Sequence, residues 1–119
     1  MSQTTDQPRN ILVAIDFSPI TDDVVNHAAH LCRLLPARLT LLHVAPREPD
    51  MFGRQLGRKL IDDDNVPEDL KEAREQLNTH AQLVRAEGVE VVTVLIRGEA
   101  VGTILDEAQR SETILITMG

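Results

Sequence analysis

Four short, predominantly apolar runs divide the chain, and they constrain its fold more than any other feature. They are residues 11–15, 39–45, 90–97 and 113–118. Runs of this kind are typical of strands that are buried on both faces, as in parallel sheets. Parallel neighbours need a long crossover connection, usually a helix. The runs therefore predict an α/β domain with an open parallel sheet and helices on both faces.

The interval after the first run has the pattern of a helix. Ser18 is a suitable N-cap, and Pro19 fits the first helical position. Asp22 and Asp23 follow in the first turn, where the helix dipole favours negative charge. One apolar face is expected to contain Val24, Val25, Ala28, Leu31, Cys32 and Leu35. Pro36 ends the helix.

Two further helices are expected, separated from the first by an irregular segment. Residues 46–66 have no periodic pattern and predict a long excursion. A helix then begins after Pro67 and ends at Gly88. A shorter one follows Gly98. Its inward residues are expected to be Val101, Ile104, Leu105 and Ala108.

Length and composition limit the possible functions. The chain has 119 residues, enough for one domain, and a formal net charge of −7, which argues against binding to nucleic acid. Aromatic residues make up only 2%, so no stacking platform for single strands is expected. Cys32 is the single cysteine, the first ten residues are polar, and no apolar run is long enough for a bilayer. These features predict a cytoplasmic protein without a membrane span.

Four stretches resemble the universal stress protein family. They are Asn10-Ile-Leu-Val-Ala-Ile-Asp-Phe-Ser, Leu41-Leu-His-Val, Arg97-Gly-Glu-Ala and Ile114-Leu-Ile-Thr-Met-Gly. Their order and spacing cover essentially the whole chain. The resemblance implies a Rossmann-like sheet, related to the adenine nucleotide alpha hydrolases, with strand order 3-2-1-4-5. It also implies an adenine nucleotide, ATP or AMP, in the crevice where the strand order reverses, with Mg²⁺ accompanying ATP.

The same resemblance implies the residues of this site. Three residues at the end of the first strand would line the base and ribose, one in the second strand would pack on the adenine, and two at the end of the fourth would begin the approach to the phosphates. The implied nucleotide-binding residues are Ala14, Ile15, Asp16, Val44, Met118 and Gly119. Asp16 can accept hydrogen bonds from hydroxyl groups, although it is also placed to cap the first helix.

The sequence departs from the ATP-binding branch of the family after Gly119. That branch continues with a Gly-x-x-Gly stretch, a Gly-Ser or Gly-Thr pair, a helix and a fifth strand. The expectation is therefore a single domain, residues 1–119, that is incomplete at its C-terminus, with strand order 3-2-1-4 and weakened phosphate binding. Without the fifth strand, the fourth becomes an exposed edge, which favours a homodimer or another homo-oligomer.

Other polar residues permit alternatives that are weaker. A phosphorylated receiver domain would need an aspartate at the end of the third strand, where Arg97 stands. His27 and His30 could ligate a metal, but nothing completes the site, and solvated histidines are favoured. His43 and Cys32 are expected inside the protein. A basic cluster could cover bound phosphates, but solvated side chains are the simpler interpretation for Arg54, Arg58 and Lys59.

No catalytic motif is present in the sequence, so binding is predicted rather than catalysis. The favoured function is a regulatory stress-response domain that binds adenine nucleotide and acts through dimerisation or a regulated protein partner. A nucleotide-independent interaction module is the alternative, and slow ATP hydrolysis is the third.

Overall fold

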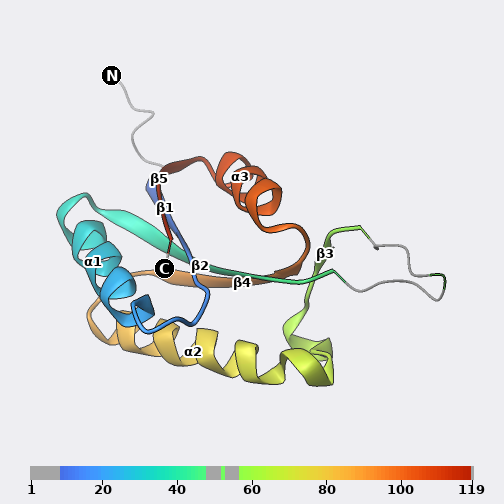
Figure 1. Ribbon diagram of the computed structural model, residues 1–119. Coiled ribbons are helices and arrows are strands. Elements are labelled where there is room, and N and C mark those ends of the chain that lie inside the picture. Colours follow the sequence, from blue (N-terminus) through green and yellow to red (C-terminus); the bar gives the residue numbers. More distant parts are fainter. Residues whose placement is uncertain (1–8, 48–51, 53–56, 119) are drawn as a thin grey trace.

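Strands and helices alternate along the chain as the apolar runs predict. The computed structural model describes residues 9–47, 52 and 57–118 (Figure 1). The elements are β1 (Arg9–Ala14), α1 (Thr21–Leu34), β2 (Ala37–Ala45), β3 (Lys59–Leu60), α2 (Lys71–Ala86), β4 (Val91–Arg97), α3 (Ala100–Arg110) and β5 (Thr113–Met118), with 3₁₀ turns at Asp63–Asn65 and Glu68–Leu70. Within these ranges, no helix combines the length and the apolar character that crossing a bilayer would require.

The sheet has the predicted open parallel core. Its strand order is β3-β4-β2-β1-β5, and β4, β2, β1 and β5 run parallel. The predicted order of the four apolar runs is therefore confirmed. The segment that was expected to be irregular also contributes the short edge strand β3, which pairs antiparallel with the end of β4. Two residues are too few to show the alternation by which a strand is recognised in a sequence.

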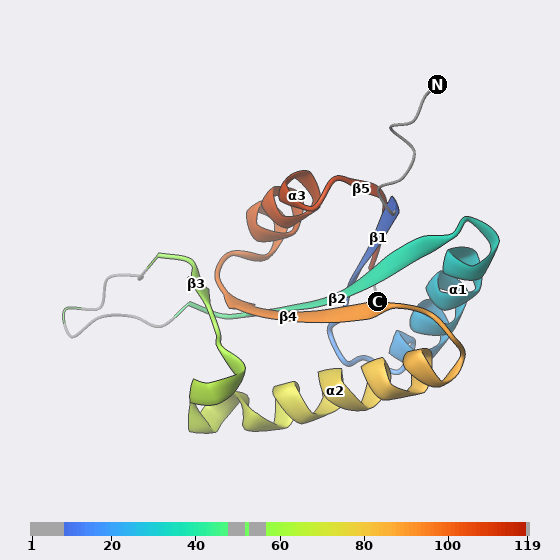
Figure 2. The same cartoon turned by 180° about the vertical axis from the view of Figure 1, so that it is seen from behind.

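Helices cover the two faces of this sheet unequally. Figure 1 shows α1 and α2 together on one face and α3 alone on the other, and the reverse view in Figure 2 agrees. The first face is packed by a cluster that includes Ile11, Val25, Leu41 and Leu77. A second cluster, beneath α3, contains Leu12, Leu42, Ile96 and Ala108. Successive residues of β1 thus point to opposite faces, which is why the run is apolar throughout.

The first helix begins later than its sequence signals predict. α1 starts at Thr21, whose backbone N–H donates to the Ser18 carbonyl at 3.0 Å. No side chain caps this helix, so the prediction of Ser18 as N-cap is wrong. The Ser18 backbone N–H is instead bound by the Asp16 carboxylate, which forms a turn before the helix. At the other end, Leu35 lies at the C-cap and is exposed, although it was expected on the buried face.

The apolar residues of α3 do not all face the sheet. Ala108 is buried and Ile104 packs against the second cluster, as predicted. Val101 and Leu105 are 62% and 56% exposed, so the prediction that they face inward is wrong. That prediction rests on the rule that apolar residues mark the buried side of a helix. In α3, however, the residues against the sheet include the polar Thr103 and Glu107, which rotates Val101 and Leu105 outward.

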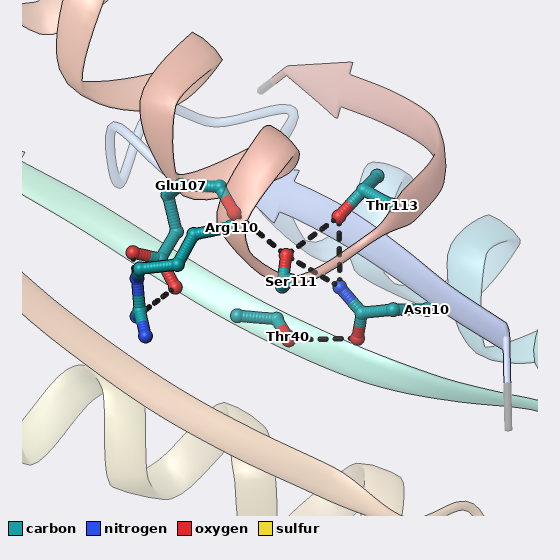
Figure 3. Close-up of polar contacts among 6 residues, drawn as sticks. All are labelled: Asn10, Thr40, Glu107, Arg110, Ser111 and Thr113. Atoms are coloured by element: carbon teal, nitrogen blue, oxygen red, sulfur yellow. Dashed lines mark hydrogen bonds and ion pairs between the residues drawn. The ribbon is translucent and has the colours of Figure 1, made fainter. Parts of the chain in front are cut away.

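A buried polar network joins β1, β2 and the turn between α3 and β5 (Figure 3). The Asn10 side chain is fully buried. Its Oδ1 accepts from Thr40 Oγ1 at 2.8 Å, and its Nδ2 donates to Thr113 Oγ1 at 2.9 Å and to Ser111 Oγ at 3.3 Å. Ser111 Oγ in turn donates to the Glu107 carbonyl at 2.7 Å. This network lies where the β1–β5 register shifts, between Asn10 and Ile11, and it fixes the end of α3 on the sheet.

Candidate functional site

Three of the predicted site residues meet at one edge of the sheet, where the parallel strands end. Ala14 is the register partner of Met118 on β5 and of Leu42 on β2. Val44 follows Leu42 by two residues and therefore lies just beyond this point on β2. The carboxyl ends of adjacent parallel strands form the crevice in which open α/β sheets bind ligands. The order reverses here, because β1 is joined through α1 to β2 on one side and lies next to β5 on the other.

Ile15 extends the pairing of β1 by one residue. Its backbone N–H donates to the Leu42 carbonyl at 2.7 Å, and its side chain is buried in the core beneath α1 and α2. The His43 imidazole donates from Nδ1 to the Ile15 carbonyl at 2.7 Å. Because its side chain points into the core, Ile15 presents only its backbone to the crevice at the carboxyl ends of the strands.

Asp16 is the first exposed residue after β1. One oxygen of its carboxylate accepts from the Ser18 backbone N–H at 2.9 Å. This hydrogen bond lowers the pKa of the Asp16 carboxyl below its ordinary value of 3.8, so the group is ionised at neutral pH. A carboxylate has lone pairs for about four hydrogen bonds, so Asp16 can hold the turn and still accept hydroxyl donors. Asp16 does not cap α1, so that expectation is wrong, but its bond within the turn leaves lone pairs free for a ligand.

An aromatic contact supports the turn that carries Asp16. Phe17 has a φ of 60°, in the left-handed region that residues other than glycine seldom adopt. Its ring lies on the His43 imidazole, with ring centroids 4.6 Å apart and planes inclined by 41°. Backbone conformations of this kind persist only where surrounding contacts hold them, and they concentrate at functional sites. His43 was expected to be a satisfied interior histidine; it is half-buried, and its partner is the Ile15 carbonyl of this turn.

Of four further positions, two lie outside what the structure describes and two lie in or next to β3. Gly119 and Arg54 lie outside the described residues. Arg58 forms an ion pair with Asp106 on α3, and Lys59 is part of β3. Both residues are exposed, as expected of solvated side chains, and Arg58 in addition pairs with α3.

The remaining candidates behave as ordinary structural residues. His27 and His30 are both exposed on α1, and the part of the chain that the structure describes contains no group of three or more side chains suited to a metal ion. Oδ1 of Asp22 lies 3.6 Å from Nδ1 of His80 on α2. Cys32 is buried in the core, as predicted, and this burial raises the pKa of its thiol to about 11.

Solved structures of other proteins resemble this fold closely. A universal stress protein from Archaeoglobus fulgidus is 26% identical, with a TM-score of 0.71 over 93% of this chain and 74% of its own. The universal stress protein from Archaeoglobus fulgidus in complex with dAMP is 28% identical, with a TM-score of 0.71 over 93% of this chain and 80% of its own. Universal stress protein UspA from Lactobacillus plantarum has the same fold, at 22% identity and a TM-score of 0.67 over 95% of this chain and 77% of its own. A search of curated protein sequences found no match.

The sequence itself carries the family pattern over nearly its full length. Residues 8–119 match the family model described as Universal stress protein family. This match covers all described strands and helices, including the strand ends around Ala14 and the turn at Asp16. The chain belongs to the universal stress protein family.

Proposed function

We propose that this protein binds an adenine nucleotide, AMP or ATP, at the carboxyl ends of β1, β2 and β5. The observation that carries the proposal is the direct pairing of Ala14 with Met118 beside the Asp16 turn. The relative solved with dAMP supports adenine as the base. Backbone groups of Ala14 and Ile15 would read the base, Val44 would pack against it, and the approach to the phosphates would begin at Met118 and Gly119.

Asp16 has the central chemical role in this proposal. Its ionised carboxylate accepts hydrogen bonds from the ribose hydroxyls, and the Ser18 N–H holds it in place. Hydrogen bonds to a charged group contribute about 1.5–3 kcal/mol each, which corresponds to roughly ten- to a hundredfold in affinity. ATP would bring Mg²⁺ with it, since phosphate oxygens are the ligands that this ion prefers.

Calorimetric titration with AMP, dAMP, ATP and GMP tests the proposal. AMP should bind more tightly than GMP, and Asp16→Ala should lower the affinity for AMP by about tenfold or more. Asp16→Asn retains an oxygen that can accept from Ser18 and should show an intermediate loss. The matched control is Asp23→Asn, which removes the same charge from an exposed position in the first turn of α1 and should leave affinity unchanged.

Binding of the nucleotide would regulate either self-association or a protein partner. The homodimer is part of this proposal, and sedimentation velocity with and without AMP tests it. Equal affinity for AMP and GMP, or an Asp16→Ala variant that binds AMP as well as the parent, would refute the nucleotide site. Phosphate release from ATP above that of a boiled sample would instead favour slow hydrolysis.

The exposed side of α3 favours a second candidate function, a protein-interaction module that does not depend on nucleotide. Val101 and Leu105 lie one turn apart and are both more than half exposed. Adjacent apolar side chains of this kind are typical of contact surfaces. A Val101→Ser/Leu105→Gln variant that loses self-association while retaining AMP affinity would separate this function from nucleotide binding.

A further inference from the structure

A cavity of about 420 Å³ lies between α3 and the edge formed by β3 and β4. It is lined by residues from three segments that are distant in the sequence, and none of them is among the six residues of the proposed nucleotide site. The cavity lies at β4 and the Asp16 turn follows β1. These two strands are not neighbours, because β2 lies between them. Its volume is within the range of small-molecule sites.

A buried hydroxyl group in this cavity has no partner. Thr103 is 1% exposed and lines the cavity, and its Oγ1 makes no hydrogen bond within the described part of the chain. Buried polar groups are nearly always paired, and one that is not commonly marks a place that a ligand or water completes. Gly98 lies against this hydroxyl, because a Cβ added there would be 2.6 Å from Thr103 Oγ1.

Three of the residues that line the cavity are positively charged. Arg58 and Lys59 come from the segment at β3, and Arg110 comes from the end of α3. Two carboxylates accompany them, which leaves an excess of one positive charge in a protein whose net charge is −7. Lys59 has no ion-pair partner in the described segments, and this free ammonium group favours a negatively charged ligand.

The ion pair between two of the lining residues can open at little cost. Arg58 and Asp106 form it with side chains that are 42% and 63% exposed. Exposed pairs of this kind contribute little to stability, so an acid group can replace Asp106 on the guanidinium. Arg110 differs, because it is held by two hydrogen bonds to the buried Glu107 carboxylate (Figure 3). Arg58, beside Lys59, is thus a cation available to a ligand.

The wall on the sheet side is apolar. Ile96 is buried there, and Leu60 on β3 leaves more than half of its side chain exposed. A ligand that carries an apolar body would cover Leu60 and remove that surface from water. The cavity therefore offers an apolar wall, a hydroxyl group and a guanidinium group to one occupant.

We propose that this cavity is a second ligand site, for a small organic acid whose carboxylate or phosphate binds Arg58 and Thr103 and whose apolar body rests on Leu60 and Ile96. The planar fork of a guanidinium fits either acid group. The Thr103 hydroxyl donates to the same group and gains the partner that it lacks. This site does not depend on the nucleotide proposal.

Amide chemical shifts of the full chain, followed by NMR, test the site. The probes are hexanoate, hexyl phosphate, inorganic phosphate and hexylammonium at constant ionic strength. Both hexyl anions should give saturable shifts at Gly98, Gly102 and Thr103, whereas inorganic phosphate and hexylammonium should not. The relative strength of the two anions identifies the acid group. Shifts that do not saturate by about 10 mM, equal shifts with hexylammonium, or displacement of hexanoate by AMP would overturn the proposal.

Three variants sharpen this test. Arg58→Gln should lower the affinity for hexanoate by about tenfold, while Arg33→Gln should leave that affinity unchanged. Arg33 is the matched control because its pair with Glu87 has similar exposure, 44% and 43%. Thr103→Val should weaken hexanoate by about three- to tenfold and raise the denaturation midpoint of the free protein, since it removes a buried hydroxyl without a partner. A lower midpoint or an unchanged affinity in Thr103→Val would contradict the role of that hydroxyl.

Discussion

Replacing Asn10 by alanine should destabilise the protein more than most single substitutions. The variant loses two well-formed hydrogen bonds, to Thr40 Oγ1 and Thr113 Oγ1, and a longer one to Ser111 Oγ. It also leaves the Thr40 hydroxyl buried without an acceptor. The lost bonds and the orphaned group together correspond to about 2–4 kcal/mol in the free energy of unfolding. Typical domains have a total of about 5–15 kcal/mol, so the variant should still fold.

Urea denaturation followed by far-ultraviolet circular dichroism measures this loss. The chain has no Trp and no Tyr, so intrinsic fluorescence offers little signal. The midpoint should fall by roughly 1–3 M at an unchanged slope. Asn26→Ala is the matched control, because Asn26 is exposed on α1, and its effect should stay within about 0.5 kcal/mol.

A double variant tests the reasoning behind that magnitude. In Asn10→Ala/Thr40→Val the hydroxyl that the first change orphans is also removed. The combined loss should therefore be smaller than the sum of the single losses by about 1 kcal/mol. Strict additivity, or a loss below about 1 kcal/mol in Asn10→Ala alone, would refute the assignment of this network as a stabilising link between β1, β2 and β5.

Three further predictions follow from backbone geometry, burial and close packing. Gly88 has a φ of 86°, so Gly88→Ala should cost about 1–2 kcal/mol in urea denaturation, whereas Gly57→Ala, at an open position, should cost little. Folding raises the pKa of the Cys32 thiol from 9.0 to about 11, so the thiol of the unfolded chain ionises first as the pH rises. The free energy of unfolding should therefore fall as the pH rises between these values, and a Cys32→Ala variant should lack this decrease. In Gly98→Ala the new Cβ would lie 2.6 Å from Thr103 Oγ1, which should cost about 1–3 kcal/mol, and Thr103→Ala in the same chain should recover part of that loss.

The fold could be predicted because its strongest signals are local. Each parallel strand is a short apolar run, and each crossover has a helical pattern, so the alternation is visible in the sequence. β3 could not be found in this way, since its two residues are defined only by pairing with Ile96 and Arg97. The prediction of which α3 residues face the sheet was wrong for a different reason. Glu107 is buried because Arg110 neutralises its charge, and no hydrophobic pattern records such a pair.

The candidate site could be predicted only in part. The topology places the end of β1 next to that of β5, and the pairing of Ala14 with Met118 follows from it. The roles of individual residues came from the family resemblance and stay predictions. The Arg58–Asp106 pair was not predictable, because it joins residues that are 48 positions apart and Arg58 lies in the segment without a periodic pattern. The left-handed φ of Phe17 was equally hidden, since the usual sequence sign of such a conformation is glycine.

The hydrogen bond of His43 to the Ile15 carbonyl gives this protein a built-in spectroscopic probe. A carbonyl oxygen only accepts, so the imidazole must carry its hydrogen on Nδ1, and Nε2 is the nitrogen that does not take part in this hydrogen bond. The Phe17 ring shifts the resonances of the neighbouring imidazole protons through its ring current, as it lies 4.6 Å away. One histidine among the four in the chain therefore reports on the conformation of the Asp16 turn, without any label being introduced.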